Sequence, residues 1–203
     1  MLNNEIGVKI TDKKPDNIPR TKYSKSYCAF MGQAREGNVF YTTNEDINCP
    51  LARYNLGLEE LDKKGLDSLA STIVSWGDAE DKSKALKYLE SSNTLNYDRK
   101  YIIYFPINQN NLNIEPDIVI NIGTPKKFMP ILRKLTKQDG DWLNARLSGV
   151  GGLCGESTAI PIMTDEPNIS LGCGGSRPYG KLENGQLFLA YPFKYFELFS
   201  NYQ

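Results

Sequence analysis

A short sequence frame that occurs twice constrains the fold of this chain most. Residues 49–59 read CPLARYNLGLE, and residues 173–183 read CGGSRPYGKLE. A cysteine, an arginine four residues later and a Leu-Glu pair at the end match without a gap, at an offset of 124 residues. The other two cysteines, Cys28 and Cys154, precede the two frames at an offset of 126 residues. The frame therefore predicts an internal duplication.

Strand and helix patterns alternate along the chain and predict an α/β or α+β fold. β-Branched and aromatic runs predict strands at residues 5–10, 39–43, 101–105, 117–122 and 186–191. Helical spacing of apolar residues predicts helices at residues 24–36, within 58–92, after Thr124-Pro125 and at the aromatic C-terminal end. We expect two related halves, about residues 5–95 and 100–203, to form one compact domain over residues 1–203.

The charge balance excludes several classes of partner. Lys plus Arg and Asp plus Glu both number 24, whereas binders of nucleic acids or of membrane surfaces carry a basic excess. No apolar run approaches the ~20 residues of a membrane helix, and the first residues lack the pattern of a signal peptide. We therefore expect a cytoplasmic protein that binds neither nucleic acid nor membrane.

The absence of histidine restricts the possible chemistry. It excludes the Ser-His-Asp triad, the Cys-His dyad and every zinc site that contains histidine. The soft metal ligands that remain are the four cysteines: Cys28, Cys49, Cys154 and Cys173. A duplicated unit would bring the two cysteine pairs together across a pseudo-twofold axis, so four thiolates could converge on one metal centre.

Local sequence around the cysteines is typical of thiolate ligands. Cys49-Pro50 predicts a helix start, where free N–H groups and the helix dipole stabilise a negative sulfur. Gly155 directly follows Cys154, Gly174 directly follows Cys173, and both would let backbone N–H groups approach a cluster closely. Arg53 and Arg177, each four residues after a cysteine, would offset the negative charge of the centre.

Several interpretations of the four cysteines stay open. They could be buried core residues or form two structural disulfides. Isolated cysteines in glycine-rich loops favour a [4Fe–4S] cluster, with a role in electron transfer or redox sensing and a possible redox partner protein. A structural zinc held by all four cysteines, in a non-enzymatic binding or regulatory module, is the alternative, although zinc sites mostly use short paired spacings. A third hypothesis is a thiol enzyme with Cys49 or Cys154 as nucleophile. A homodimer that shares the centre is also possible.

The order of several motifs resembles the domain of unknown function 169 family of bacteria and archaea. The motifs are YCA at 27–29, AxxGxxFYT at 34–42, CPxAxxxLGL at 49–58, PDIV at 116–119, GxxC at 151–154 and SxGCGxxR at 170–177. The resemblance extends from about residue 5 to residue 200, with a shorter helical lead before the first strand. It implies a single conserved domain whose defining pattern includes the cysteine segments, and it brings no catalytic residues with it.

Overall fold

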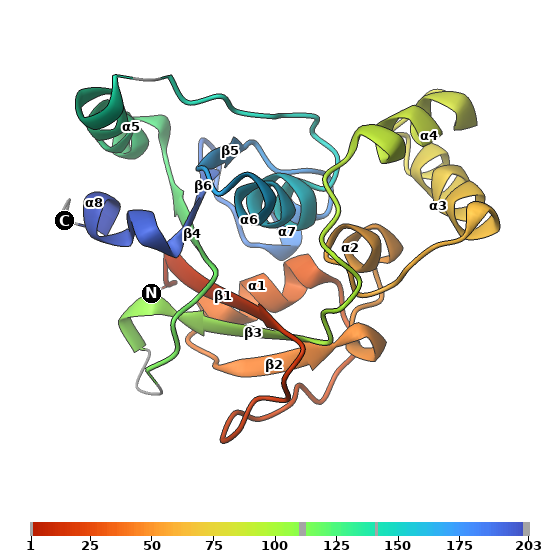
Figure 1. The fold of residues 1–203 in the computed structure, drawn as a ribbon, viewed down its shortest axis with the longest axis horizontal. Coiled ribbons are helices and arrows are strands. Elements are labelled where there is room, and N and C mark those ends of the chain that lie inside the picture. The colour runs from red at the N-terminus through yellow and green to blue at the C-terminus, as the bar shows by residue number, and fades with distance from the viewer. Residues whose placement is uncertain (1, 110–112, 141, 201–203) are drawn as a thin grey trace.

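A six-stranded antiparallel sheet forms the centre of the protein in this computed structural model, which describes residues 2–109, 113–140 and 142–200 (Figure 1). The strands lie in the order β2-β3-β1-β4-β6-β5, and each neighbouring pair is antiparallel. Their bounds are β1 Glu5–Thr11, β2 Phe40–Thr43, β3 Tyr101–Pro106, β4 Ile118–Gly123, β5 Asn168–Ser170 and β6 Leu187–Pro192.

The strand order divides the sheet into two groups of three that meet where β1 pairs with β4. Ile6 of β1 lies opposite Ile120 of β4 in this central pairing. On one side β3 pairs with both β1 and β2, and on the other β6 pairs with both β4 and β5. In each group the middle strand comes last in the sequence and the edge strand comes second.

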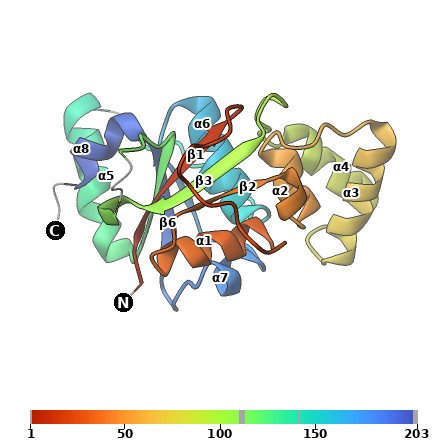
Figure 2. The same ribbon diagram turned by 90° about the horizontal axis from the view of Figure 1, so that it is seen from below.

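Helices cover both faces of the sheet. Their bounds are α1 Tyr27–Arg35, α2 Pro50–Asn55, α3 Lys63–Ser75, α4 Lys82–Ser91, α5 Pro125–Asp139, α6 Ile160–Thr164, α7 Ser176–Tyr179 and α8 Phe196–Ser200. Short 3₁₀ turns are η1 Asn44–Asp46, η2 Ile107–Gln109 and η4 Phe193–Tyr195, and a π-helix, η3, covers Gly152–Ala159. Helices α3 and α4 form a hairpin that stands out beyond the end of the sheet (Figures 1 and 2).

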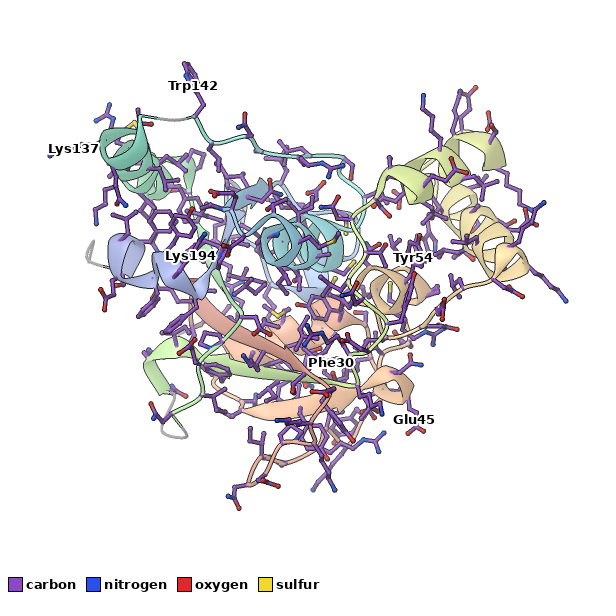
Figure 3. The ribbon with its side chains drawn as sticks, viewed as in Figure 1. Phe30, Glu45, Tyr54, Lys137, Trp142 and Lys194 are labelled. Atoms are coloured by element: carbon purple, nitrogen blue, oxygen red, sulfur yellow. The ribbon has the colours of Figure 1, made fainter. Side chains whose placement is uncertain are left out.

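The largest core lies on the sheet face that carries α1, α2 and η3. Period-2 alternation sends every second residue of β1 and β4 to this face, including Val8 and Ile120. These side chains are buried against Phe30 of α1 and Leu153 of η3. Phe30 points into the molecule in Figure 3, whereas Trp142 projects outward and is 89% exposed.

The opposite face of β4 and β6 packs against α5 and α8, which lie on the far side of the molecule from α3 and α4 (Figure 2). Val119 and Leu189 are buried there against Phe128 and Phe199. Because both faces of the central strands are covered, the run YIIYF of β3 and the run IVI of β4 are continuously apolar or aromatic.

The predicted mixed α/β class and its five predicted strands are confirmed, and Cys49 and Pro50 begin α2 as N-cap and first residue. The unpredicted elements include the short edge strand β5, the π-helix η3 and the short helices α6 and α7. None of the helices in the described part of the chain is long and apolar enough to cross a lipid bilayer.

Candidate metal centre

One cavity of about 420 Å³ is lined by all four cysteines, although they come from four separate segments of the chain. Cys28 is the second residue of α1, Cys49 caps α2, Cys154 lies in η3, and Cys173 lies three residues before α7. All four thiols are free. The predicted convergence of cysteine segments is therefore present in the fold.

Cys28 and Cys173 contact each other across the cavity. The Cys28 thiol donates toward the Cys173 sulfur, which raises the pKa of Cys28, and burial raises it further. The same hydrogen bond, with others from Ser176 and from the backbone N–H of Gly152, lowers the pKa of Cys173 to about 4. Ser176 N lies 3.4 Å from that sulfur, and the Ser176 hydroxyl accepts from Cys173 N at 2.6 Å. Cys173 is therefore the thiolate of the metal-free protein.

Cys49 occupies the N-cap of α2, where its sulfur faces the free backbone N–H groups of Leu51 and Ala52. Burial raises the pKa of Cys49, while those two N–H groups and the charge of Arg53 act in the opposite direction. Pro50 at the first helical position has no N–H to leave unpaired, and its fixed φ suits the start of a helix. The local sequence thus aims helix N–H groups at the sulfur.

Cys154 is the most buried of the four, at 4% exposure. The π-helix that carries it is held by side chains that reach back five residues: the Ser157 hydroxyl donates to Gly152 O at 2.8 Å and the Thr158 hydroxyl to Leu153 O at 2.7 Å. Burial raises the pKa of Cys154 strongly, and the neighbouring Cys49 and Cys173 sulfurs raise it further. Asn55 Nδ2, 3.6 Å from the sulfur, and the N–H of Gly155 favour the charged form.

Two glycines allow the cysteine segments to come together. A Cβ at Gly152 would lie 2.7 Å from both Cys173 N and Gly172 Cα, so only glycine permits this contact of η3 with the segment before α7. A Cβ at Gly32 of α1 would lie 2.3 Å from Tyr179 O of α7. These backbone contacts bring the Cys154 and Cys28 segments against the Cys173 segment.

The two predicted arginines lie outside the set of described residues that line the cavity. Arg53 Nε pairs with Glu59 Oε2 at 2.6 Å, yet its charge reaches Cys49. Arg177 donates instead to backbone carbonyls, with Nη1 2.8 Å from Leu171 O and 3.2 Å from Gln186 O. Of the two predicted glycines, Gly174 lines the cavity, whereas the Gly155 N–H donates to Gly151 O at 2.7 Å and only weakly lowers the pKa of Cys154.

The two copies of the repeated frame have the same local backbone geometry. In each copy the Leu N–H donates to the Arg carbonyl at 2.9 Å, and the residue before that Leu has a left-handed φ, +66° at Gly57 and +57° at Lys181. In each copy the Arg N–H also donates to the cysteine carbonyl, at 3.1 Å in the first and 3.2 Å in the second. This pattern of bonds closes both short helices, α2 and α7, with a Schellman motif.

Two residues at the cavity, Trp76 and Asp78, were missed by sequence reasoning. Trp76, Asp78 and Tyr179 line the cavity, and both rings are largely exposed, at 46% and 58%. Burial and the neighbouring Cys173 thiolate raise the pKa of Asp78. Glu156, two residues after Cys154, is 3% exposed and accepts from Ser148 and Gly149 backbone N–H groups at 2.5 and 2.8 Å. It therefore fixes the loop that precedes η3.

Within the described residues, no group of three or more His, Cys, Asp or Glu side chains is arranged to hold a metal ion. A tetrahedral zinc with Zn–S bonds of ≈2.3 Å requires its four sulfurs to lie about 3.8 Å apart. The four sulfurs share a cavity without this tight grouping.

Comparison with known proteins places the chain in a family. The sequence model of the family described as uncharacterised ArCR, domain of unknown function 169, matches residues 3–201. The chain belongs to this family. It is also similar to a protein named "Uncharacterized protein MJ0308" from Methanocaldococcus jannaschii, with 24% identity over 191 residues, which is 92% of this chain and 81% of that protein. No solved structure matches. The family resemblance inferred from the motifs is thus confirmed.

Proposed function

We propose that this protein holds a [4Fe–4S] cluster on Cys28, Cys49, Cys154 and Cys173 and acts in electron transfer or redox sensing. The observation that carries the proposal is the single cavity of about 420 Å³ lined by all four cysteines. In a chain without histidine, four thiols from four distant segments in one cavity constitute a soft, all-sulfur ligand set.

The surroundings of the sulfurs support an anionic sulfur-rich centre. Backbone N–H groups of Leu51 and Ala52 face Cys49, that of Gly155 faces Cys154, and that of Gly152 faces Cys173. Hydrogen bonds of this kind stabilise thiolate ligands and help to set the reduction potential of a cluster. The positive charge of Arg53 acts on the same side of the cavity.

The volume of the cavity favours a cluster over a structural four-cysteine zinc, which would use the same ligands. Zinc needs four sulfurs close around one ion, and the described residues contain no such group. A four-iron cluster takes its ligands at separate corners, so the sulfurs lie further apart around a larger volume. A cavity of about 420 Å³ provides that volume.

The arrangement of the two strand groups supports an internal duplication. β1-α1-β2-α2-β3 would correspond to β4-η3-β5-α7-β6, with the pseudo-twofold axis between β1 and β4 (Figure 1). Cys28 and Cys154 would then be equivalent, as would Cys49 and Cys173, and the shared backbone of the two frames supports the same pairing. In this proposal β3 belongs to the first unit. The halves expected from the sequence, about residues 5–95 and 100–203, had instead placed β3 in the second.

The cavity opens past Trp76 and Tyr179, which gives a redox partner protein a surface from which to reach the centre. We place this activity in the cytoplasm, because all four thiols are free and reducing compartments keep them so.

Anaerobic purification followed by iron, acid-labile sulfide and zinc analysis tests the proposal. We expect brown protein with equal amounts of iron and sulfide, about four of each per chain. Each Cys→Ser variant should lose most of its iron, whereas Tyr179→Phe, at the same cavity, should keep it. Colourless protein that stays free of iron after reconstitution would refute the cluster, and one zinc per chain would establish the alternative.

One observation favours a second candidate, a nucleophilic thiol. The pKa of Cys173, about 4, makes it a thiolate at neutral pH, and the Cys28 thiol contacts it directly. Sequence reasoning placed a nucleophile at Cys49 or Cys154, but burial raises the pKa of both. Under this candidate, iodoacetamide labels Cys173 first in metal-free protein prepared without reconstitution, and that protein binds no iron when iron and sulfide are supplied.

A further inference from the structure

We propose that Asn55 is a positioning residue that holds the Cys154 sulfur and raises the reduction potential of the centre. The inference rests on the proposed function and deepens it, because it names the side chain that regulates one ligand of that cluster. Asn55 is the last residue of α2, and its side-chain nitrogen lies 3.6 Å from Cys154 Sγ. The helix that presents Cys49 thereby also contacts the opposite ligand.

The surroundings of Asn55 are built around its amide. The residue is fully buried, and Leu95 N anchors its carbonyl at 3.0 Å. A Cβ at Gly151 or at Gly155 would lie 3.1 or 3.0 Å from Asn55 Nδ2. A side chain at either position would be too close to the Asn55 amide. Glycine at positions 151 and 155 therefore leaves space for the Asn55 side chain.

The orientation of the amide points to a role for its N–H groups. Nδ2 faces the Cys154 sulfur, and Asn55 also donates toward the Tyr88 hydroxyl, which in turn donates to Val150 O at 3.0 Å. The amide oxygen, by contrast, is buried without a protein partner. Reversing the amide would turn this oxygen toward a thiolate. The Asn55 side chain therefore directs its N–H donors to the Cys154 sulfur, and its amide oxygen has no hydrogen-bond partner within the protein.

A second cavity of about 190 Å³ is lined in part by Asn55, and none of its described lining residues is a cysteine. Tyr88, Ser148 and Glu156 line it with Asn55. A volume of this size accommodates water, which could donate to the unpaired amide oxygen. Asn55 thus lines this second cavity while its side-chain nitrogen contacts the Cys154 sulfur.

An N–H···S bond to a cluster ligand stabilises the more negative, reduced state. Loss of this bond therefore lowers the potential. We expect Asn55→Leu, which has nearly the same shape but no donor, to reduce the equilibrium constant for cluster reduction by about tenfold, which corresponds to 59 mV for a one-electron couple. Asn55→Asp replaces the donor with a negative oxygen and should lower it further.

The test is a redox titration of the reconstituted full chain, followed in the visible spectrum, for wild type and three variants. The matched control is Asn121→Leu. Asn121 of β4 is also buried, at 1% exposure. Its amide donates to Glu5 Oε1 and accepts from Lys127 Nζ, and it is not among the described residues that line the cysteine cavity. The expected order of potentials is wild type equal to N121L, then N55L, then N55D.

The outcomes separate the inference from the proposed function. A cluster whose potential is the same in wild type, N55L and N55D overturns the inference and leaves the cluster in place. An equal fall in N121L also overturns it, because the effect would then follow from a lost core amide anywhere in the fold. Wild-type protein that binds no cluster overturns the proposed function, and the inference with it. A potential that falls in N55D but not in N55L also overturns the inference, because the added charge alone accounts for it. If N55L does not fold, Asn55→Ala, which removes the donor without adding a charge, decides the result.

Discussion

Substitution of Gly152 by alanine tests whether close backbone contact brings the cysteines together. The added Cβ would lie 2.7 Å from Cys173 N and Gly172 Cα and 2.8 Å from Gly172 C. Optimal contact between carbon atoms lies at about 3.5–4.0 Å, so the two segments must separate by roughly 0.7 Å or more. All three contacts are backbone atoms, and therefore no side-chain rotation relieves them.

Overpacking of this kind costs about 1–3 kcal/mol, and backbone contacts place G152A near the upper end. For a chain of this length, a loss of about 2 kcal/mol lowers Tm by roughly 4–8 °C. The separation also moves Gly152 N–H away from the Cys173 sulfur and displaces Cys154 from the cavity. We therefore expect G152A to bind less iron than wild type even at temperatures where it is folded.

The matched control is Gly174→Ala, which lines the same cavity but has no atom within 4 Å of its added Cβ. Urea unfolding, thermal unfolding and iron content are measured for both variants of the full chain. G174A should stay within about 0.5 kcal/mol of wild type. The reasoning fails if G152A matches G174A in all three measurements, because the contact of η3 with Cys173 would then be loose.

Three further outcomes follow from other contacts. In metal-free protein, Cys28→Ala removes the hydrogen bond that lowers the pKa of Cys173, so this pKa should rise. Alkylation of Cys173 at pH 6, followed by mass spectrometry of labelled peptides, should then be slower than in wild type. An unchanged alkylation rate contradicts the assignment. Arg35→Lys should lower the free energy of unfolding, measured in urea, by about 2–4 kcal/mol. The buried guanidinium donates to Gly180 O and Asn4 Oδ1, and a lysine ammonium cannot reproduce this forked geometry. A loss below about 1 kcal/mol would be inconsistent with this reasoning. Glu156→Gln should cost about 1.5–3 kcal/mol by the same assay, because Ser148 N–H and Gly149 N–H would then bond a neutral amide oxygen and the amide nitrogen would face the Ser170 hydroxyl, which donates to the carboxylate. An equally stable variant would argue against a buried carboxylate there.

Most of the sheet could be predicted from the sequence because its strands are long apolar runs. Residues 117–122 predicted β4 almost to the residue, since a strand covered on both faces is apolar throughout. Cys49 and Pro50 predicted the start of α2 because the rule for a proline at the first helical position is local. Predictions that depended only on local sequence, such as an apolar run or a helix cap, were therefore accurate.

The missed parts of the structure depend on tertiary contacts. β5 is three residues long, and its Asn168 and Ser170 are buried because they bond Arg146, Glu156 and the chain around them. The sequence of η3, GLCGESTA, has no helical period, since all eight residues are buried. Trp76 and Asp78 follow the end of α3 and resemble surface residues until the fold places them at the cavity.

The π-helix itself argues for a functional constraint on Cys154. In the proposed duplication η3 corresponds to α1, which is a regular α-helix around Cys28. π-Helical turns are rare and concentrate at functional sites, because their wider turn weakens packing along the axis. Here the wide turn is held by the hydroxyls of Ser157 and Thr158, and Thr158 also bonds the buried Tyr27 hydroxyl beside Cys28 at 2.8 Å. In the proposed duplication the second unit thus departs from the first at the residues that place the Cys154 sulfur 3.6 Å from Asn55 Nδ2.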